Sequence, residues 1–128
     1  MVASIIVATC NRADSLAETL QSMASLRVPE NLPTELIVVD NSSNDGTAEL
    51  LRTARFANLT FRHVLEPKPG KANALNAGIA AARGEVLLFT DDDVRVPVDW
   101  VQRMSGQILT GTADAVAGGV RMAPHLER

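Results

Sequence analysis

Apolar runs and segments with helical spacing alternate along the whole chain. Short runs rich in Val, Ile, Leu and Phe are typical of strands, whereas apolar residues three or four positions apart are typical of helices. The runs predict strands at residues 4–9, 35–40, 59–65, 86–90 and 114–120. The segments between them predict helices at residues 14–26, 48–54, 71–82 and 96–109, the last beginning at Pro97. This alternation predicts an α/β fold with a mainly parallel sheet, right-handed crossovers and helices on both faces.

The same periodicities predict which side chains face the sheet. In the third strand, Phe61 is expected on one face and Val64 on the other. Trp100 is expected to pack half-buried rather than to form a platform for a sugar, and Arg52, Arg55 and Arg62 are expected on the solvated surface. The inward positions expected in the helices are Leu16, Leu20, Met23 and Ala24 in the first, Leu75, Ile79 and Ala82 in the third, and Val101, Met104 and Ile108 in the fourth.

The run at residues 86–90 ends at three consecutive acids, Asp91, Asp92 and Asp93. The run itself predicts a strand buried on both faces, as in a parallel sheet. Adjacent carboxylates repel one another, and they are tolerated where water solvates them or where a divalent cation neutralises them. Mg²⁺ and Mn²⁺ take oxygen ligands and commonly bridge carboxylates to phosphates. A solvated acidic turn is the alternative, but the carboxyl ends of strands are where open α/β sheets bind ligands, so a metal–phosphate site is favoured.

Polar residues also follow the first two predicted strands. Thr9, Cys10, Asn11 and Arg12 come after the first, and the segment at residues 40–43 comes after the second. Such residues can also serve as turn or capping residues. For Asn11, this structural role and ligand contact explain the residue equally well. For Asp40, which directly ends an apolar strand, ligand contact is favoured. Together these strand ends predict a crevice across neighbouring strands.

Composition narrows the class of protein further. The chain has 128 residues, which fits one domain, and a formal net charge of −3, which argues against nucleic acid as a partner. With three Phe, one Trp and no Tyr, it has no base-stacking platform. The single Cys fits a reducing compartment, and no stretch is long enough to cross a bilayer. The glycine motifs of nicotinamide-binding and P-loop proteins are missing.

The chain resembles the nucleotide-sugar-binding half of a family-two glycosyltransferase with the GT-A fold. The resemblance rests on SIIVATCNR, ELIVVDNSSNDGT, EPKPGKANALNAGIAAARGEVLLFTDDD and AVAGG, which together extend over nearly the whole chain. The second and third pieces are specific in combination. The first loop departs from the family, because Cys10 stands where an aromatic residue is usual.

The resemblance implies a role for each matching position. Thr9, Asn11 and Arg12 would line the base and ribose pocket, and Asp40 would hydrogen-bond the uracil ring or another base. Lys71 would help to hold the donor.

Two of the three aspartates match the outer positions of the family's D-x-D signature. Asp91 would face the ribose and the metal, and Asp93 would coordinate Mn²⁺ or Mg²⁺ on the diphosphate. The donor would be a nucleoside-diphosphate sugar, with a UDP-sugar as the first expectation, and the departing group would be a nucleoside diphosphate.

The implied function is the donor-substrate domain, residues 1–128, of an inverting glycosyltransferase. The acceptor-binding part and the catalytic base are expected beyond Arg128, so the acceptor is unknown. A binding module without turnover is the alternative, and a nucleotidyltransferase-like domain is a weaker one. The domain is expected in the cytoplasm, membrane-associated if the parent protein is longer, and self-association is expected through the last strand, Ala115 to Val120.

Overall fold

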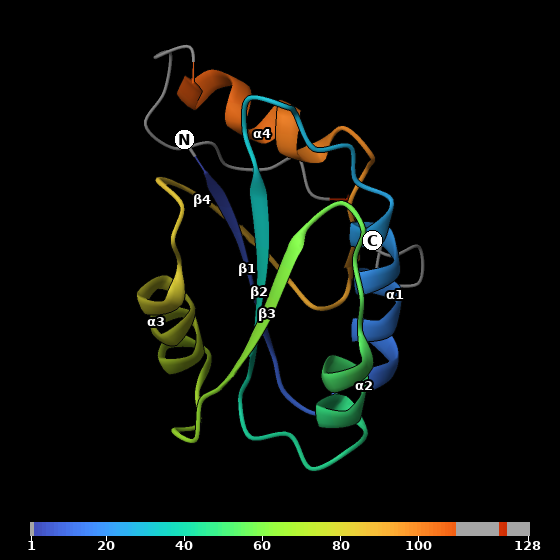
Figure 1. Ribbon diagram of the computed structural model, residues 1–128. Coiled ribbons are helices and arrows are strands. Elements are labelled where there is room, and N and C mark those ends of the chain that lie inside the picture. Colours follow the sequence, from blue (N-terminus) through green and yellow to red (C-terminus); the bar gives the residue numbers. More distant parts are fainter. Residues whose placement is uncertain (1, 110–120, 123–128) are drawn as a thin grey trace.

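A computed structural model describes residues 2–109 and 121–122 of the chain. Four parallel strands form a sheet in the order β3–β2–β1–β4, with α3 over one face and α1 and α2 over the other (Figure 1). The predicted α/β fold is therefore confirmed. The strands of this sheet are β1 (Ala3–Thr9), β2 (Thr34–Asp40), β3 (Thr60–Leu65) and β4 (Val86–Thr90). The helices are α1 (Ala13–Ala24), α2 (Thr47–Thr53), α3 (Lys71–Ala81) and α4 (Trp100–Leu109).

The register of the sheet places three strand ends side by side. Strand β1 lies between β2 and β4, with Thr9 opposite Asp40 and Val7 opposite Thr90. Because the strands are parallel, their carboxyl ends meet at one edge. The loops that follow β1, β2 and β4 therefore open at the same place, as the sequence predicts for a crevice.

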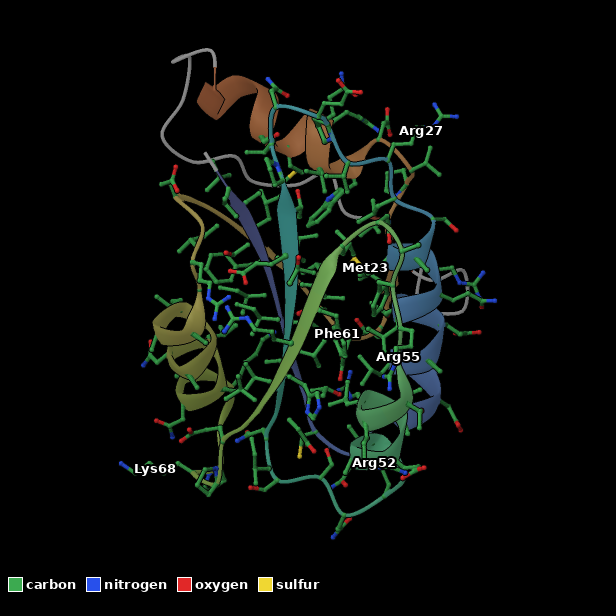
Figure 2. All side chains as sticks on the ribbon, in the orientation of Figure 1. Met23, Arg27, Arg52, Arg55, Phe61 and Lys68 are labelled. Atoms are coloured by element: carbon green, nitrogen blue, oxygen red, sulfur yellow. The ribbon has the colours of Figure 1, made fainter. Side chains whose placement is uncertain are left out.

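Each face of the sheet has its own core. The larger core packs β1, β2 and β4 against α1, α2 and α4, and the smaller one packs β2 against α3. Met23 of α1 and Phe61 of β3 point into the larger core, whereas Arg52 and Arg55 are exposed at the surface (Figure 2). Leu16, Leu20 and Met23 are buried as predicted, but Ala24 at the end of α1 is exposed.

The inward face predicted for α3 is wrong. Ile79 is 43% exposed and Leu75 is half-buried, while Ala74 and Gly78 are the buried residues. A methyl group at Gly78 would lie 2.6 Å from Ile6 Cγ2. The helix therefore lies so close to the sheet that only small residues fit between them.

Strand β4 is buried on one face only. Val86 and Leu88 are 3% exposed, whereas Phe89 is 44% exposed. The prediction of burial on both faces is wrong for the described residues, because β4 is the edge of their four-stranded sheet and α3 packs over β1 and β2 instead.

The start of α4 also differs from the prediction. The chain after β4 continues as a short strand, β5 (Val94–Arg95), which pairs with β6 (Arg121–Met122). Hydroxyl groups of α1 hold this stretch extended, since Thr19 donates to the Val94 carbonyl and Ser22 accepts from the Val96 amide. Helix α4 consequently begins at Trp100 rather than at Pro97. Val101 and Met104 face inward as predicted. The side chain of Ile108 and the predicted strand at 114–120 lie outside the part of the chain that the structure describes.

A buried acid joins the elements at the opposite end of the sheet. Glu35 accepts hydrogen bonds from the Ser4 hydroxyl at 2.5 Å, the Arg83 amide at 2.7 Å and Arg62 Nη2 at 2.7 Å. Arg62 also donates to the Ala81 carbonyl at 2.6 Å, so it is not the solvated residue that the sequence predicts. Burial by itself would raise the pKa of Glu35, but these hydrogen bonds and the Arg62 charge outweigh it and lower the pKa.

Neutralising Glu35 should destabilise the fold at neutral pH. We expect Glu35→Gln to lower the free energy of unfolding at pH 7 by about 1–3 kcal/mol, because it leaves Arg62 with a weaker partner. Since the folded-state pKa lies below the unfolded value, the stabilisation by Glu35 is complete above roughly pH 4.3 and is lost as the pH falls through the folded pKa. Urea unfolding at pH 7 and pH 3 measures both effects.

The control is Glu49→Gln, which removes a carboxylate of an exposed pair with Arg52. It should leave the unfolding curve unchanged. Equal stability of wild type and Glu35→Gln at pH 7 would show that Glu35 is not the acid that fastens this end of the sheet.

Among residues 2–109 and 121–122, no helix is both long enough and apolar enough to cross a bilayer.

Candidate functional site

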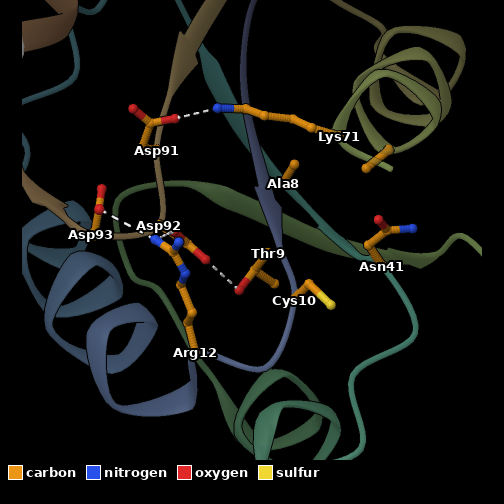
Figure 3. A pocket seen from close by; sticks show the side chains of 10 residues that line it. Ala8, Thr9, Cys10, Arg12, Asn41, Lys71, Asp91, Asp92 and Asp93 are labelled. Carbon is orange, nitrogen blue, oxygen red and sulfur yellow. Dashed lines mark hydrogen bonds and ion pairs between the residues drawn. The ribbon is translucent and has the colours of Figure 1, made fainter. Parts of the chain in front are cut away.

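A cavity of about 360 Å³ opens at the carboxyl ends of β1, β2 and β4 (Figure 3). This volume lies within the usual range of small-molecule sites. The lining residues are Ala8, Thr9, Cys10, Arg12, Asn41, Lys71, Ala74, Asp91, Asp92 and Asp93. Five of the residues predicted for the site, namely Thr9, Arg12, Lys71, Asp91 and Asp93, are thus brought together from β1, α3 and the end of β4.

The three aspartates point in different directions (Figure 3). Asp91 turns toward α3, where Lys71 Nζ lies 2.8 Å from its Oδ1. Asp92 turns toward Thr9 at the end of β1. Asp93 lies farther from β1, with its Oδ2 3.3 Å from Arg12 Nη1. The divergence separates the negative charges and gives each carboxylate a partner of opposite or neutral charge.

Asp92 is the buried member of the three, only 6% exposed. The pairing of Val7 with Thr90 brings Thr9 level with Asp92, and the Thr9 hydroxyl donates to Asp92 Oδ2 at 2.8 Å. Arg12 Nη1 lies 3.4 Å from Asp92 Oδ1. Burial raises the pKa of Asp92, and the hydrogen bond from Thr9 and the charge of Arg12 oppose this rise. Asp92 therefore ties the loop after β1 to the loop after β4.

Lys71 is the first residue of α3 and depends on Gly70 for its position. Gly70 has a φ of +116°, a backbone conformation that other residues rarely adopt. The hydrogen bond and charge of Asp91 raise the pKa of Lys71, and the charges of Asp92 and Asp93 add to the rise. Lys71 is therefore a firmly protonated cation at the mouth of the cavity.

Asn41 fixes the loop that leads to Lys71; the sequence places it among the polar residues after the second strand but predicts no role for it. Its side-chain amide donates to the Glu66 carbonyl at 3.0 Å and the Lys68 carbonyl at 2.7 Å, and its Oδ1 accepts from the Gly70 amide at 3.0 Å. An Asn directly after a strand, followed by a proline- and glycine-rich loop, was the only signal. An amide that both donates and accepts suits this bridging task.

Asn11 and Asp40 lie outside the set of residues that line the cavity. Asn11, with a φ of 53°, accepts from the Asn44 amide at 2.8 Å, and Asp40 Oδ1 accepts from the Ser43 amide at 3.0 Å. Asn11 therefore holds the loop after β2 against the loop after β1, whereas the hydrogen bond of Asp40 lies within the loop after β2. The second oxygen of Asp40, Oδ2, accepts no hydrogen bond from the residues that the structure describes.

The carboxylates suit a divalent cation that is shared with a bound ligand. Within the described ranges, no group of three or more His, Cys, Asp or Glu side chains is arranged to hold a metal unaided. Mg²⁺ and related ions are usually held by one or two carboxylates together with substrate phosphates, not by an all-protein cage. Asp91 and Asp93, whose side-chain partners among the described residues are the exposed cations Lys71 and Arg12, fit this mode.

Comparison with known proteins gives consistent matches. The family profile described as Glycosyl transferase family 2 matches residues 4–125. The poly-β-1,6-N-acetyl-D-glucosamine synthase of Staphylococcus epidermidis is 37% identical over 97 residues, which is 75% of this chain and 23% of that protein.

Two solved structures illustrate the structural match. TarS 1–349 of S. aureus in complex with UDP-GlcNAc has a TM-score of 0.72 at 28% identity, covering 86% of this chain and 32% of that one. The mannosyltransferase PcManGT of Pyrobaculum calidifontis, in complex with GDP-Man and Mn²⁺, has a TM-score of 0.67 at 35% identity, covering 77% and 30%. The chain thus spans a third or less of the length of these relatives.

Proposed function

Because this chain belongs to glycosyl transferase family 2, we propose that residues 1–128 hold the nucleoside-diphosphate sugar of such an enzyme. The observation that carries the proposal is the meeting of two carboxylates, Asp91 and Asp93, with two cations, Arg12 and Lys71, around one cavity at the carboxyl edge of the sheet. Carboxylates that accept a divalent ion and cations that accept phosphate are the two requirements of a diphosphate site.

Each element of the site has a task in this proposal. Asp93, with Asp91, would hold Mn²⁺ or Mg²⁺, and Lys71 would lie against the diphosphate. The bound ion would offset the negative charge that grows on the departing nucleoside diphosphate. Thr9 and Asp92 keep the two loops in register for that contact.

The base and ribose are proposed to lie toward the loops after β1 and β2. Thr9, Asn11 and Arg12 would border them, and the second oxygen of Asp40 would accept a hydrogen bond from the base. One matched structure is a complex with UDP-GlcNAc and another a complex with GDP-Man, so a binding panel has to decide the base, with uracil as the first expectation.

The sugar would pass, with inversion, to an acceptor hydroxyl in the full-length enzyme. The carboxylates at this edge are assigned to donor and metal, so the base that deprotonates the acceptor would come from another part of that enzyme. Such a base typically contributes about 10²–10⁴-fold to the rate.

Cys10 reports directly on occupancy of the cavity. It is exposed, it lines the cavity, and it is the single cysteine of the chain. We expect UDP with Mn²⁺ to slow the labelling of Cys10 by a thiol reagent such as DTNB, by about tenfold when the nucleotide is near ten times its Kd.

The same labelling run with EDTA, and with uridine in place of UDP, is the control and should show little protection. If calorimetry detects UDP binding while the labelling rate stays constant, the nucleotide binds somewhere other than this cavity.

A further inference from the structure

Two side chains already supply positive charge to the aspartates. Lys71 comes from the start of α3 and Arg12 from the loop after β1, so they approach from opposite sides (Figure 3). Lys71 Nζ is 2.8 Å from Asp91, and Arg12 Nη1 is 3.3 Å from Asp93 and 3.4 Å from Asp92. Three negative and two positive charges leave this cluster with a formal charge of −1.

Resting on the proposed donor site, we infer that Lys71 and Arg12 are resident counter-ions that a metal and a diphosphate displace together. In the free site the two cations hold the carboxylates. When a divalent ion takes Asp91 and Asp93, the cations turn to the diphosphate oxygens. The chain therefore binds metal or nucleotide weakly alone and strongly in combination.

The contacts are of the kind that can exchange. The side chains of Lys71 and Arg12 are 67% and 56% exposed, and exposed ion pairs are held weakly. The Arg12 distances also exceed the roughly 2.7–2.9 Å of a strong charged hydrogen bond. Both residue types bind phosphate well, Arg with its planar fork and Lys as a point charge.

The buried Asp92 is a fixed partner for Arg12 while Arg12 exchanges Asp93 for the diphosphate. Its side chain is 8% exposed, and the 2.8 Å hydrogen bond from Thr9 holds one oxygen in place. Arg12 can therefore release the more exposed Asp93, whose side chain is 20% exposed, while it stays near Asp92. Arg12 thus remains at the mouth of the cavity in both states.

The inference predicts effects of opposite sign on two ligands. Replacing a residue that only supports the fold would weaken the binding of every ligand and lower the melting temperature. A resident counter-ion competes with the metal for the carboxylates and assists binding of the nucleotide. Its removal should therefore raise the affinity for the metal and lower the affinity for the nucleotide.

The test uses Lys71→Met, Arg12→Met and the double variant. Mn²⁺ binding without nucleotide is measured by electron paramagnetic resonance of the free ion, and UDP and GDP binding by calorimetry at saturating Mn²⁺. Each single variant should bind Mn²⁺ alone about two- to fivefold more tightly. Each should bind the diphosphate roughly tenfold or more weakly.

The matched control is Arg103→Met. Arg103 lies on α4, is not among the residues that line the cavity, and also forms an exposed ion pair, 3.7 Å from Asp99. The substitution changes the net charge equally and should alter neither affinity.

Three results would overturn the inference. Loss of both affinities with a lower melting temperature would make the pairs purely structural. Unchanged Mn²⁺ affinity with weaker diphosphate binding would remove the counter-ion role and leave the donor site intact. Absence of UDP and GDP binding in the wild type with Mn²⁺ would remove the proposed function and the inference with it.

Discussion

Replacing Asp93 by Asn should remove most of the metal dependence of UDP binding. The carboxylate of Asp93 is proposed to hold the divalent ion, and a charged contact of this kind is worth about 1.5–3 kcal/mol, or roughly 10- to 150-fold in affinity. For the wild type we expect a similar or larger loss when EDTA removes the metal. Calorimetric titration of UDP with Mn²⁺ and with EDTA measures both, and the UDP affinity of Asp93→Asn should differ little between the two conditions.

Asp92→Asn is the matched control for this prediction. The amide oxygen of an Asn can still accept the hydrogen bond from Thr9, so the loops stay joined while one charge is lost. Its effect on UDP affinity should be clearly smaller than that of Asp93→Asn. Equal UDP affinity of the wild type in Mn²⁺ and in EDTA would contradict a metal-dependent site.

Replacing Trp100 by Ala should strongly destabilise the chain without changing the site. Trp100 is 1% exposed in the core between α4 and the sheet, so it is fully buried rather than half-buried as the sequence predicts. Removing a buried Trp side chain costs about 3–5 kcal/mol in the free energy of unfolding. Urea unfolding measures the loss, and UDP affinity should be unchanged under conditions in which the variant is folded.

Trp100→Phe separates packing from polar contacts. The indole Nε1 has no hydrogen-bond partner among the described residues, so Phe removes only volume and should cost less than Ala. Normal stability with lost nucleotide binding in either variant would instead support the platform that the sequence left open.

The order of the four parallel strands and of the helices between them was predictable because each apolar run is short and is bounded by turn residues. The face of α3 was not predictable. Residues 71–82 are almost all small or apolar, so the sequence offers little contrast between faces, and the large residues Leu75 and Ile79 were the natural choice. The decisive factor is how closely α3 approaches Ile6, which depends on Gly78 and on the packing of the whole sheet.

The site was predictable as a set of strand ends but not as a set of contacts. The acids after β4 and the polar residues after β1 could be found along the chain. Their pairing required the strand order, which places β1 between β2 and β4 and so brings Thr9 to Asp92. The bridge made by Asn41 depends on a loop 25 residues further along, whose path the sequence does not specify.

A crystal structure of the chain grown with UDP and Mn²⁺ would locate the metal by its anomalous scattering and test the donor site most directly. We predict one manganese peak bound by Asp93 and by the diphosphate, with Lys71 turned from Asp91 to a phosphate oxygen. A nucleotide seated away from the carboxyl edge of the sheet, or a diphosphate bound there with no manganese on the aspartates, would contradict the proposed site.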